Sequence, residues 1–79
     1  MLFCNLLSVD GKKALYAMGG TPEDLTGLLL IDAENETFEI LKEPENSKVY
    51  LAHIRSMLWY HQEELNNGVF KKRMAYQIG

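Results

Sequence analysis

Cysteine is almost absent from this chain, and so is any long apolar run; each shortage excludes a class of protein. The single thiol, that of Cys4, forms no internal disulfide, and a structural zinc site of the usual kind needs further cysteines. The aliphatic run at residues 28–31 is too short to cross a bilayer. Residues 1–7 are apolar, but they lack a basic region and meet Asp10 too early for a signal peptide. We therefore expect a soluble cytoplasmic protein with no membrane contact, since a reducing compartment suits a lone thiol.

Positive charge is also in short supply. Eight Lys and Arg residues against eleven Asp and Glu give a net charge of −3, so no overall field attracts nucleic acid. Three cations stand together near the end, and six acids fall within residues 32–45. A solvated acidic loop and a charged edge strand account for both clusters. A nucleic-acid-binding accessory protein that uses Lys71, Lys72 and Arg73 is the second hypothesis, which the acidic total and the lack of a recognised binding motif disfavour.

Residue types that support catalysis are few and widely spaced. His53 and His61 are eight residues apart, about 12 Å along a helix axis, so they cannot hold one metal ion together. Cys4 stands among apolar residues in a predicted strand, where cysteine usually acts as a small buried hydrophobe. Gly19-Gly20 is not followed by the Lys-Ser/Thr pair of a phosphate-binding loop. We expect no enzyme, no metal and no cofactor; a small enzyme ranks third among the hypotheses.

The clearest pattern that is present is a helical period over residues 47–66. Leu51, Ile54, Leu58 and Leu65 fall on one stripe, which predicts an amphipathic helix about 30 Å long. A short polar side chain at position 46 or 47 can cap its start. Asn67-Gly68 can end it, because Gly tolerates the left-handed conformation that follows a helix.

Five segments are predicted to be strands. Residues 2–9 and 12–18 flank the hairpin signal Asp10-Gly11, and residues 26–31 and 37–42 flank a polar loop. A helix over residues 21–30 is the rival interpretation, because leucines in that segment also fit a helical stripe. After Gly68 the residues alternate, and the side chains expected to face inward are Phe70, Met74, Tyr76 and Ile78.

These elements predict one small α+β domain over residues 1–79. The order is four strands, a helix and a fifth strand, which favours an antiparallel β-sheet with one long helix packed across one face. Alternating strand directions place the fifth strand beside the first, giving the order 4-3-2-1-5.

Both faces of the first predicted hairpin are apolar, yet one helix covers only one of them. With Asp10-Gly11 as the turn, the smaller aliphatic face of the hairpin suits the underside of the helix. The other face would then be uncovered, and it carries Phe3, Leu7, Val9, Tyr16 and Met18. Aromatic residues and Met are enriched in interface cores, so this face predicts a homodimer.

The outer side of the helix offers a second candidate contact. Trp59 and Tyr60 lie off the apolar stripe, and such residues are favoured anchors for a protein partner. A surface tryptophan folded over Arg55 or Glu63 fits the pattern equally well. We expect a small non-enzymatic protein that acts through self-association and protein partner binding.

Overall fold

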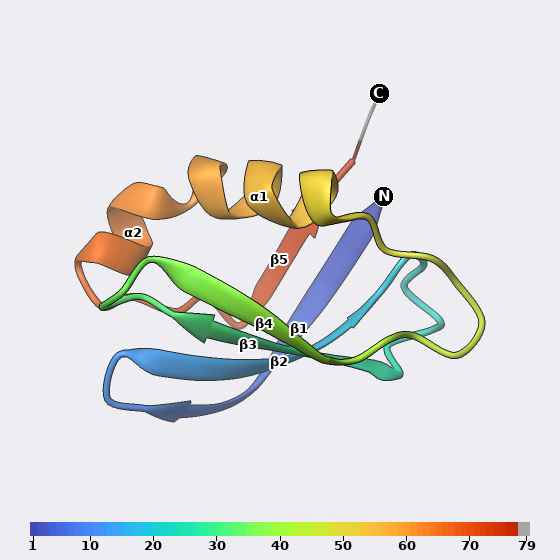
Figure 1. Cartoon of the computed structure of the whole chain (residues 1–79), viewed down its shortest axis with the longest axis horizontal. Helices are drawn as coiled ribbons and strands as arrows, with labels where there is room; N and C mark the ends of the chain where they lie inside the picture. The colour runs from blue at the N-terminus through green and yellow to red at the C-terminus, as the bar shows by residue number, and fades with distance from the viewer. Residues whose placement is uncertain (78–79) are drawn as a thin grey trace.

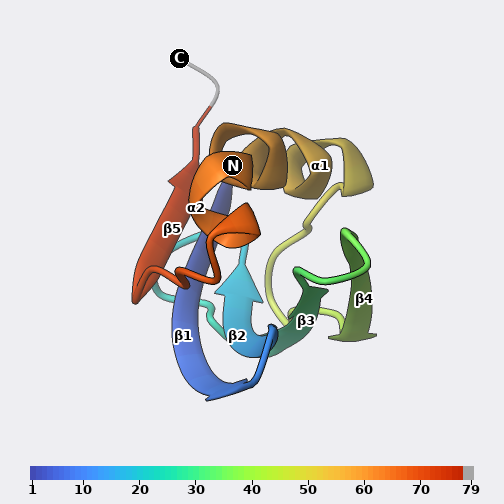
Figure 2. The same cartoon turned by 90° about the vertical axis from the view of Figure 1, so that its left-hand side faces the viewer.

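The fold is an α+β sandwich of one sheet and one helical layer. The computed structural model describes residues 1–77 and shows a five-stranded antiparallel sheet of order β4-β3-β2-β1-β5, with the helices across one face (Figures 1 and 2). The predicted class and strand order are confirmed. The elements are β1 (Leu2–Asp10), β2 (Lys13–Gly19), β3 (Gly27–Asp32), β4 (Thr37–Lys42), α1 (Leu51–Tyr60), α2 (Gln62–Asn66) and β5 (Arg73–Tyr76).

The hairpin of β1 and β2 differs from its prediction by a bulge. Its turn is Gly11-Lys12, with Gly11 at φ 61°. Ser8 pairs with Leu15 but Leu6 pairs with Tyr16, which leaves Leu7 as an extra residue in β1. Beyond an extra residue, each side chain of the strand points to the opposite face of the sheet from the one that uninterrupted pairing would give it.

The predicted faces of this hairpin are therefore wrong. Tyr16 and Met18 do not lie on the uncovered side; both are 0% exposed beneath the helices, beside Leu2 and Cys4. The Tyr16 hydroxyl donates a hydrogen bond to the backbone oxygen of Lys71 at 2.8 Å, which satisfies the polar end of a ring in the core.

Residues 21–26 form a turn that leads into β3, so the rival helix over residues 21–30 is absent. The carboxylate of Asp24 holds this turn to the segment before α1. It accepts hydrogen bonds from the Ser47 hydroxyl (2.6 Å), the Thr26 hydroxyl (2.7 Å) and the Asn46 backbone N–H (2.9 Å). These bonds, that of Ser47 first, hold the pKa of Asp24 below its ordinary range. Ser47 is thus occupied away from the helix, and α1 begins after Tyr50 with no side-chain cap.

The predicted single helix is two shorter ones. α1 ends at Tyr60 and α2 begins at Gln62, with His61 as the junction. The predicted end is confirmed, because Gly68 has φ 74° and the backbone N–H of Val69 donates to the Glu64 oxygen at 2.8 Å. Neither helix has the length and apolar composition that a membrane span requires, over the residues described.

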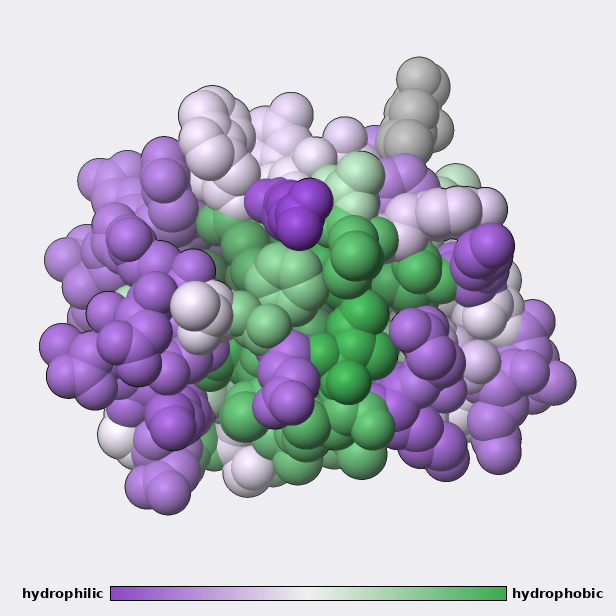
Figure 3. Space-filling view, viewed as in Figure 1, coloured by the Kyte–Doolittle hydropathy of each residue, from purple (hydrophilic) through white to green (hydrophobic). Residues whose placement is uncertain are grey.

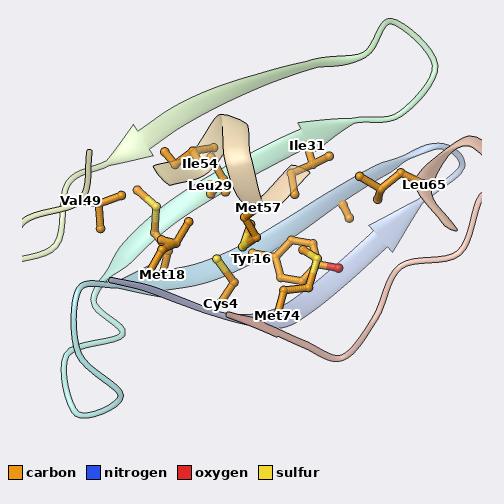
Figure 4. Close-up of a cluster of buried hydrophobic side chains, with 12 residues drawn as sticks. Cys4, Tyr16, Met18, Leu29, Ile31, Val49, Ile54, Met57, Leu65 and Met74 are labelled. Carbon is orange, nitrogen blue, oxygen red and sulfur yellow. The ribbon is translucent and has the colours of Figure 1, made fainter. Parts of the chain in front are cut away.

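The core lies between the helices and the inner face of the sheet (Figure 4). Ile54 and Met57 of α1 are fully buried, whereas Leu51 of the predicted stripe is half exposed. Met74 of β5 is buried as predicted, and Ile78 lies outside the described residues. The inner-face residues of the sheet in this core are Leu2, Cys4, Ala14, Tyr16, Met18, Leu29, Ile31 and Met74.

Candidate interaction surfaces

The face of the sheet opposite the helices is apolar at its centre. Ala17 of β2 pairs with Leu28 of β3, and Leu15 pairs with Leu30. Phe3 of β1 lies on the same face, two residues along the strand from the partner of Ala17. All five side chains are partly exposed. They form a contiguous surface across the three middle strands, termed the outer sheet patch.

Polar and charged side chains surround the outer sheet patch. Strand pairing places them on the β4 and β5 sides and at the hairpin end; they are Asn5, Lys13, Asp32, Glu39, Lys42 and Arg73. Arg73 and Glu39 stand on opposite edges of the sheet. An apolar centre within a charged rim is the usual anatomy of a protein–protein interface.

The residues predicted for the uncovered face are divided by the bulge. Phe3 belongs to the outer sheet patch, and Leu7, the extra residue, is 55% exposed. Val9 is 49% exposed near the hairpin turn, where it pairs with the buried Ala14 on the inner side. Only Phe3 therefore contributes to the centre of the uncovered face.

Trp59 and Tyr60 are prominent on the outside of α1, at 65% and 68% exposed. Their rings meet edge-on with 5.7 Å between the ring centroids. The centroid of the Tyr60 ring lies 6.1 Å from that of Tyr76 of β5. His53 lies 5.5 Å from Tyr76 and continues the row of rings toward Tyr50. The exposed side of α1 thus carries the residue types that dominate binding hot spots.

A cavity that the sequence did not reveal opens between α1 and β4. Its volume is about 380 Å³. Figure 3 shows apolar side chains exposed in the middle of this side of the molecule, between the helix and β4. We name the opening the β4 groove; its lining residues are Ile31, Asp32, Ala33, Glu36, Thr37, Phe38, Arg55, Leu58, Trp59, Gln62, Leu65 and Asn66.

Carboxylates lie around β4, and two of them, Asp32 and Glu36, belong to residues that line the β4 groove. The Asp32 carboxylate accepts bonds from the side chain and backbone of Asn35 at 2.8 and 3.1 Å, which hold its pKa below the ordinary range. Glu36 occupies the turn before β4 with φ 54°. Within residues 1–77, no ion pair involves Glu36, Glu39 or Glu43. These carboxylates are available to a cation from outside the chain.

The three predicted nucleic-acid contacts are not brought together. The Lys71 ammonium lies 3.4 Å from Glu64 of α2, on the helix side of the sheet. Arg73 pairs with Asn5 on the outer face. Lys72 accepts a backbone bond from Leu6. The cluster in the sequence is therefore divided between the two sides of the sheet.

Cys4 is buried, and the two histidines contact neighbouring side chains. Burial raises the pKa of the Cys4 thiol to about 12, and the side chain is 0% exposed. His61 lies 3.1 Å from a Glu64 oxygen, and His53 lies among the rings described above. In residues 1–77 no group of three His, Cys, Asp or Glu side chains is placed to hold a metal ion.

Comparison with known proteins gives no match to a protein-family model, to a curated protein or to a solved structure.

Proposed function

We propose that the protein acts through self-association, as a homodimer in which two outer sheet patches pack face to face. The observation that supports this proposal is the pairing of Leu15 with Leu30 and of Ala17 with Leu28 on the face opposite the helices. Large apolar patches on soluble proteins commonly mark contact sites, because their exposure to water is unfavourable.

The size of the outer face suits a modest interface. Five strands spaced about 4.8 Å apart, each about six residues long at about 3.3 Å per residue, cover about 500 Å². Two such faces bury about 1,000 Å², which is near the lower limit for a specific interface. We therefore expect a dissociation constant in the micromolar range rather than a permanent dimer.

The rim bears on how two copies pack. Two sheets packed face to face align within about 30°. If β4 of one copy lies over β5 of the other, strand pairing puts Lys42 of one copy level with Arg73 of the other and Glu39 two residues from that level, so the angle between the sheets decides which of them approaches Arg73. This arrangement is isologous, so it closes after two copies and leaves no patch for further addition.

Light scattering after size-exclusion chromatography tests the proposal. The chain mass of 9.1 kDa predicts a species of twice that mass at high micromolar concentration. Leu30→Glu places a charge in the patch and should give a monomer. Leu51→Glu makes the same change on a half-exposed leucine of α1 and should leave the dimer intact. A monomeric wild-type chain at millimolar concentration would refute self-association.

A further inference from the structure

We propose that the β4 groove binds an extended basic segment of a partner protein, which adds to the sheet as a sixth strand beside β4. This surface is separate from the outer sheet patch, and its occupant is not a second copy of the chain. The proposal rests on the open edge of β4, the cavity beside it and the charge around both.

The groove exists because the helical layer leaves space over the start of β4. α1 packs against β5 at one edge of the sheet, and Figure 2 shows β4 at the opposite edge. Phe38 and Ile40 of β4 face the inner side and remain partly exposed. Leu58 of α1 lines the other wall. The core is consequently open to water along β4.

The edge of β4 is suited to strand addition. β4 is hydrogen-bonded to β3 on one side only, so its other side presents unpaired backbone N–H and C=O groups. Side chains alternate along β4, with Phe38 and Ile40 inward and Glu39 outward. An added strand would follow the same alternation. Its inward side chains would enter the cavity, and its outward ones would lie beside Glu39.

The negative charge around β4 favours a basic segment over a second copy of the chain. Two β4 edges paired with each other would bring together the unpaired carboxylates of Glu36, Glu39 and Glu43 from both copies. Like charges on neighbouring strands are destabilising, so the edge resists self-pairing. The same carboxylates attract lysine or arginine on a strand from another protein. Arg55, the single cation of the lining, belongs to the helix wall rather than to the strand.

Trp59 can anchor a bound segment in the groove, and its fluorescence can report that binding directly. It lines the cavity and is 65% exposed, so an occupant can bury much of its ring. It is also the only tryptophan of the chain. A change in tryptophan emission therefore reports on binding at Trp59, and the variants below assign that binding to the groove rather than to the side of α1 that carries Tyr60.

The test is a fluorescence titration with a capped peptide of four Val-Lys repeats. Valines supply apolar side chains at alternate positions, and lysines supply the outward charges. We expect a saturable blue shift of Trp59 emission that weakens with added salt. The matched Val-Glu peptide should bind at least about tenfold more weakly, because its charges oppose the acidic edge. A Val-Lys peptide N-methylated along one edge, which cannot pair with a strand, should give no shift.

Variants localise the binding. Glu39→Lys should weaken the Val-Lys peptide about tenfold, whereas Glu63→Lys, the same charge change on an exposed residue of α2, should alter it less than about twofold. Binding should persist in Leu30→Glu, which separates this result from the fate of the homodimer. Equal binding of the two peptides, equal effects of the two lysine variants, or no shift at millimolar peptide would overturn the proposal.

Discussion

The two faces of the sheet are similar in hydropathy, but the helices cover only one of them. Leu29 and Leu30 are neighbours in β3, yet Leu29 is 0% exposed beneath α1 while Leu30 is partly exposed on the outer face. The inner face carries the cysteine, methionine and tyrosine side chains that the sheet contributes to the core. The outer face is mainly aliphatic. Met fills irregular gaps well, which suits the uneven underside of a helix. A flatter aliphatic surface suits another sheet.

Apolar content alone therefore does not decide which face the helix covers. That choice follows from the register of the strands, and a single extra residue in β1 changes the register. Leu7 separates the turn end of the hairpin, where Val9 pairs with Ala14, from the far end, where Cys4 pairs with Met18. Each prediction below changes one face and leaves the other as its control.

The largest difference between the faces is expected for Leu29→Ala and Leu30→Ala. Leu29→Ala leaves a cavity at a fully buried position and should lower the free energy of unfolding by about 2–5 kcal/mol. Leu30→Ala removes a partly solvated side chain and should lower it by less than about 1 kcal/mol in the monomer. Urea unfolding at nanomolar concentration, well below the expected dissociation constant of the dimer, measures both. Equal losses would mean that the outer face is covered within the monomer.

Alkaline pH should also separate the faces. Burial raises the pKa of Cys4 to about 12, and burial followed by the charge of Cys4 raises the pKa of Tyr16 to about 12. In the unfolded chain a thiol has a pKa of about 8.5, so above this pH the unfolded state holds fewer protons than the folded state. Stability is complete below about pH 8.5 and falls as pH rises toward 12, by at most about 1.4 kcal/mol per pH unit for the thiol.

The control for this prediction moves the thiol to the other face. Cys4→Ala combined with Asn5→Cys keeps one thiol in the chain but places it on the partly exposed outer side. The decline in unfolding free energy between pH 8.5 and 11 should be shallower in this variant. An unchanged slope would show that Cys4 does not titrate differently in the folded and unfolded states.

Local patterns in the sequence were sufficient for the elements and their order. The alternation in residues 26–31 and 37–42, the hairpin signal and Gly68 each depend on neighbours in the chain, and each agrees with the structure, except that the hairpin turn is Gly11-Lys12 and not the predicted Asp10-Gly11. The helix break at His61 and the bond from Ser47 to Asp24 were not predictable in this way. Ser47 satisfies a carboxylate from a distant turn, and no local pattern records that contact.

The interaction surfaces were predicted less completely, for a similar reason. Trp59 is exposed and Phe3 partly exposed where the pattern placed them, but Tyr16 and Met18 are in the core. The β4 groove depends on how closely the helices pack over the start of β4, which is a property of tertiary packing. The acids of residues 32–45 are visible in the sequence, where their clustering indicates a solvated loop. The cavity beside them is the basis for our proposal that this cluster binds a basic partner segment.

The smallest expected effect is that of deleting Leu7, although deletions within strands are usually severe. Without Leu7, Leu6 and Ser8 become neighbours and still pair with Tyr16 and Leu15, which are themselves neighbours in β2. Every side chain of β1 therefore keeps its face, and only the bulge is lost. We expect a change of less than about 1 kcal/mol in the free energy of unfolding.

Deletion of Ala17 is the matched control, because β2 has no extra residue at that position. The deletion makes Tyr16 and Met18 adjacent. In the wild-type chain both side chains point into the core. One of them must then turn to the outer face, or the strand must slip, and the core loses its packing. Circular dichroism and thermal unfolding of the two deletion variants distinguish the cases. If the Leu7 deletion is as damaging as the Ala17 deletion, the bulge is required for the fold, and the register on the far side of it depends on Leu7 itself.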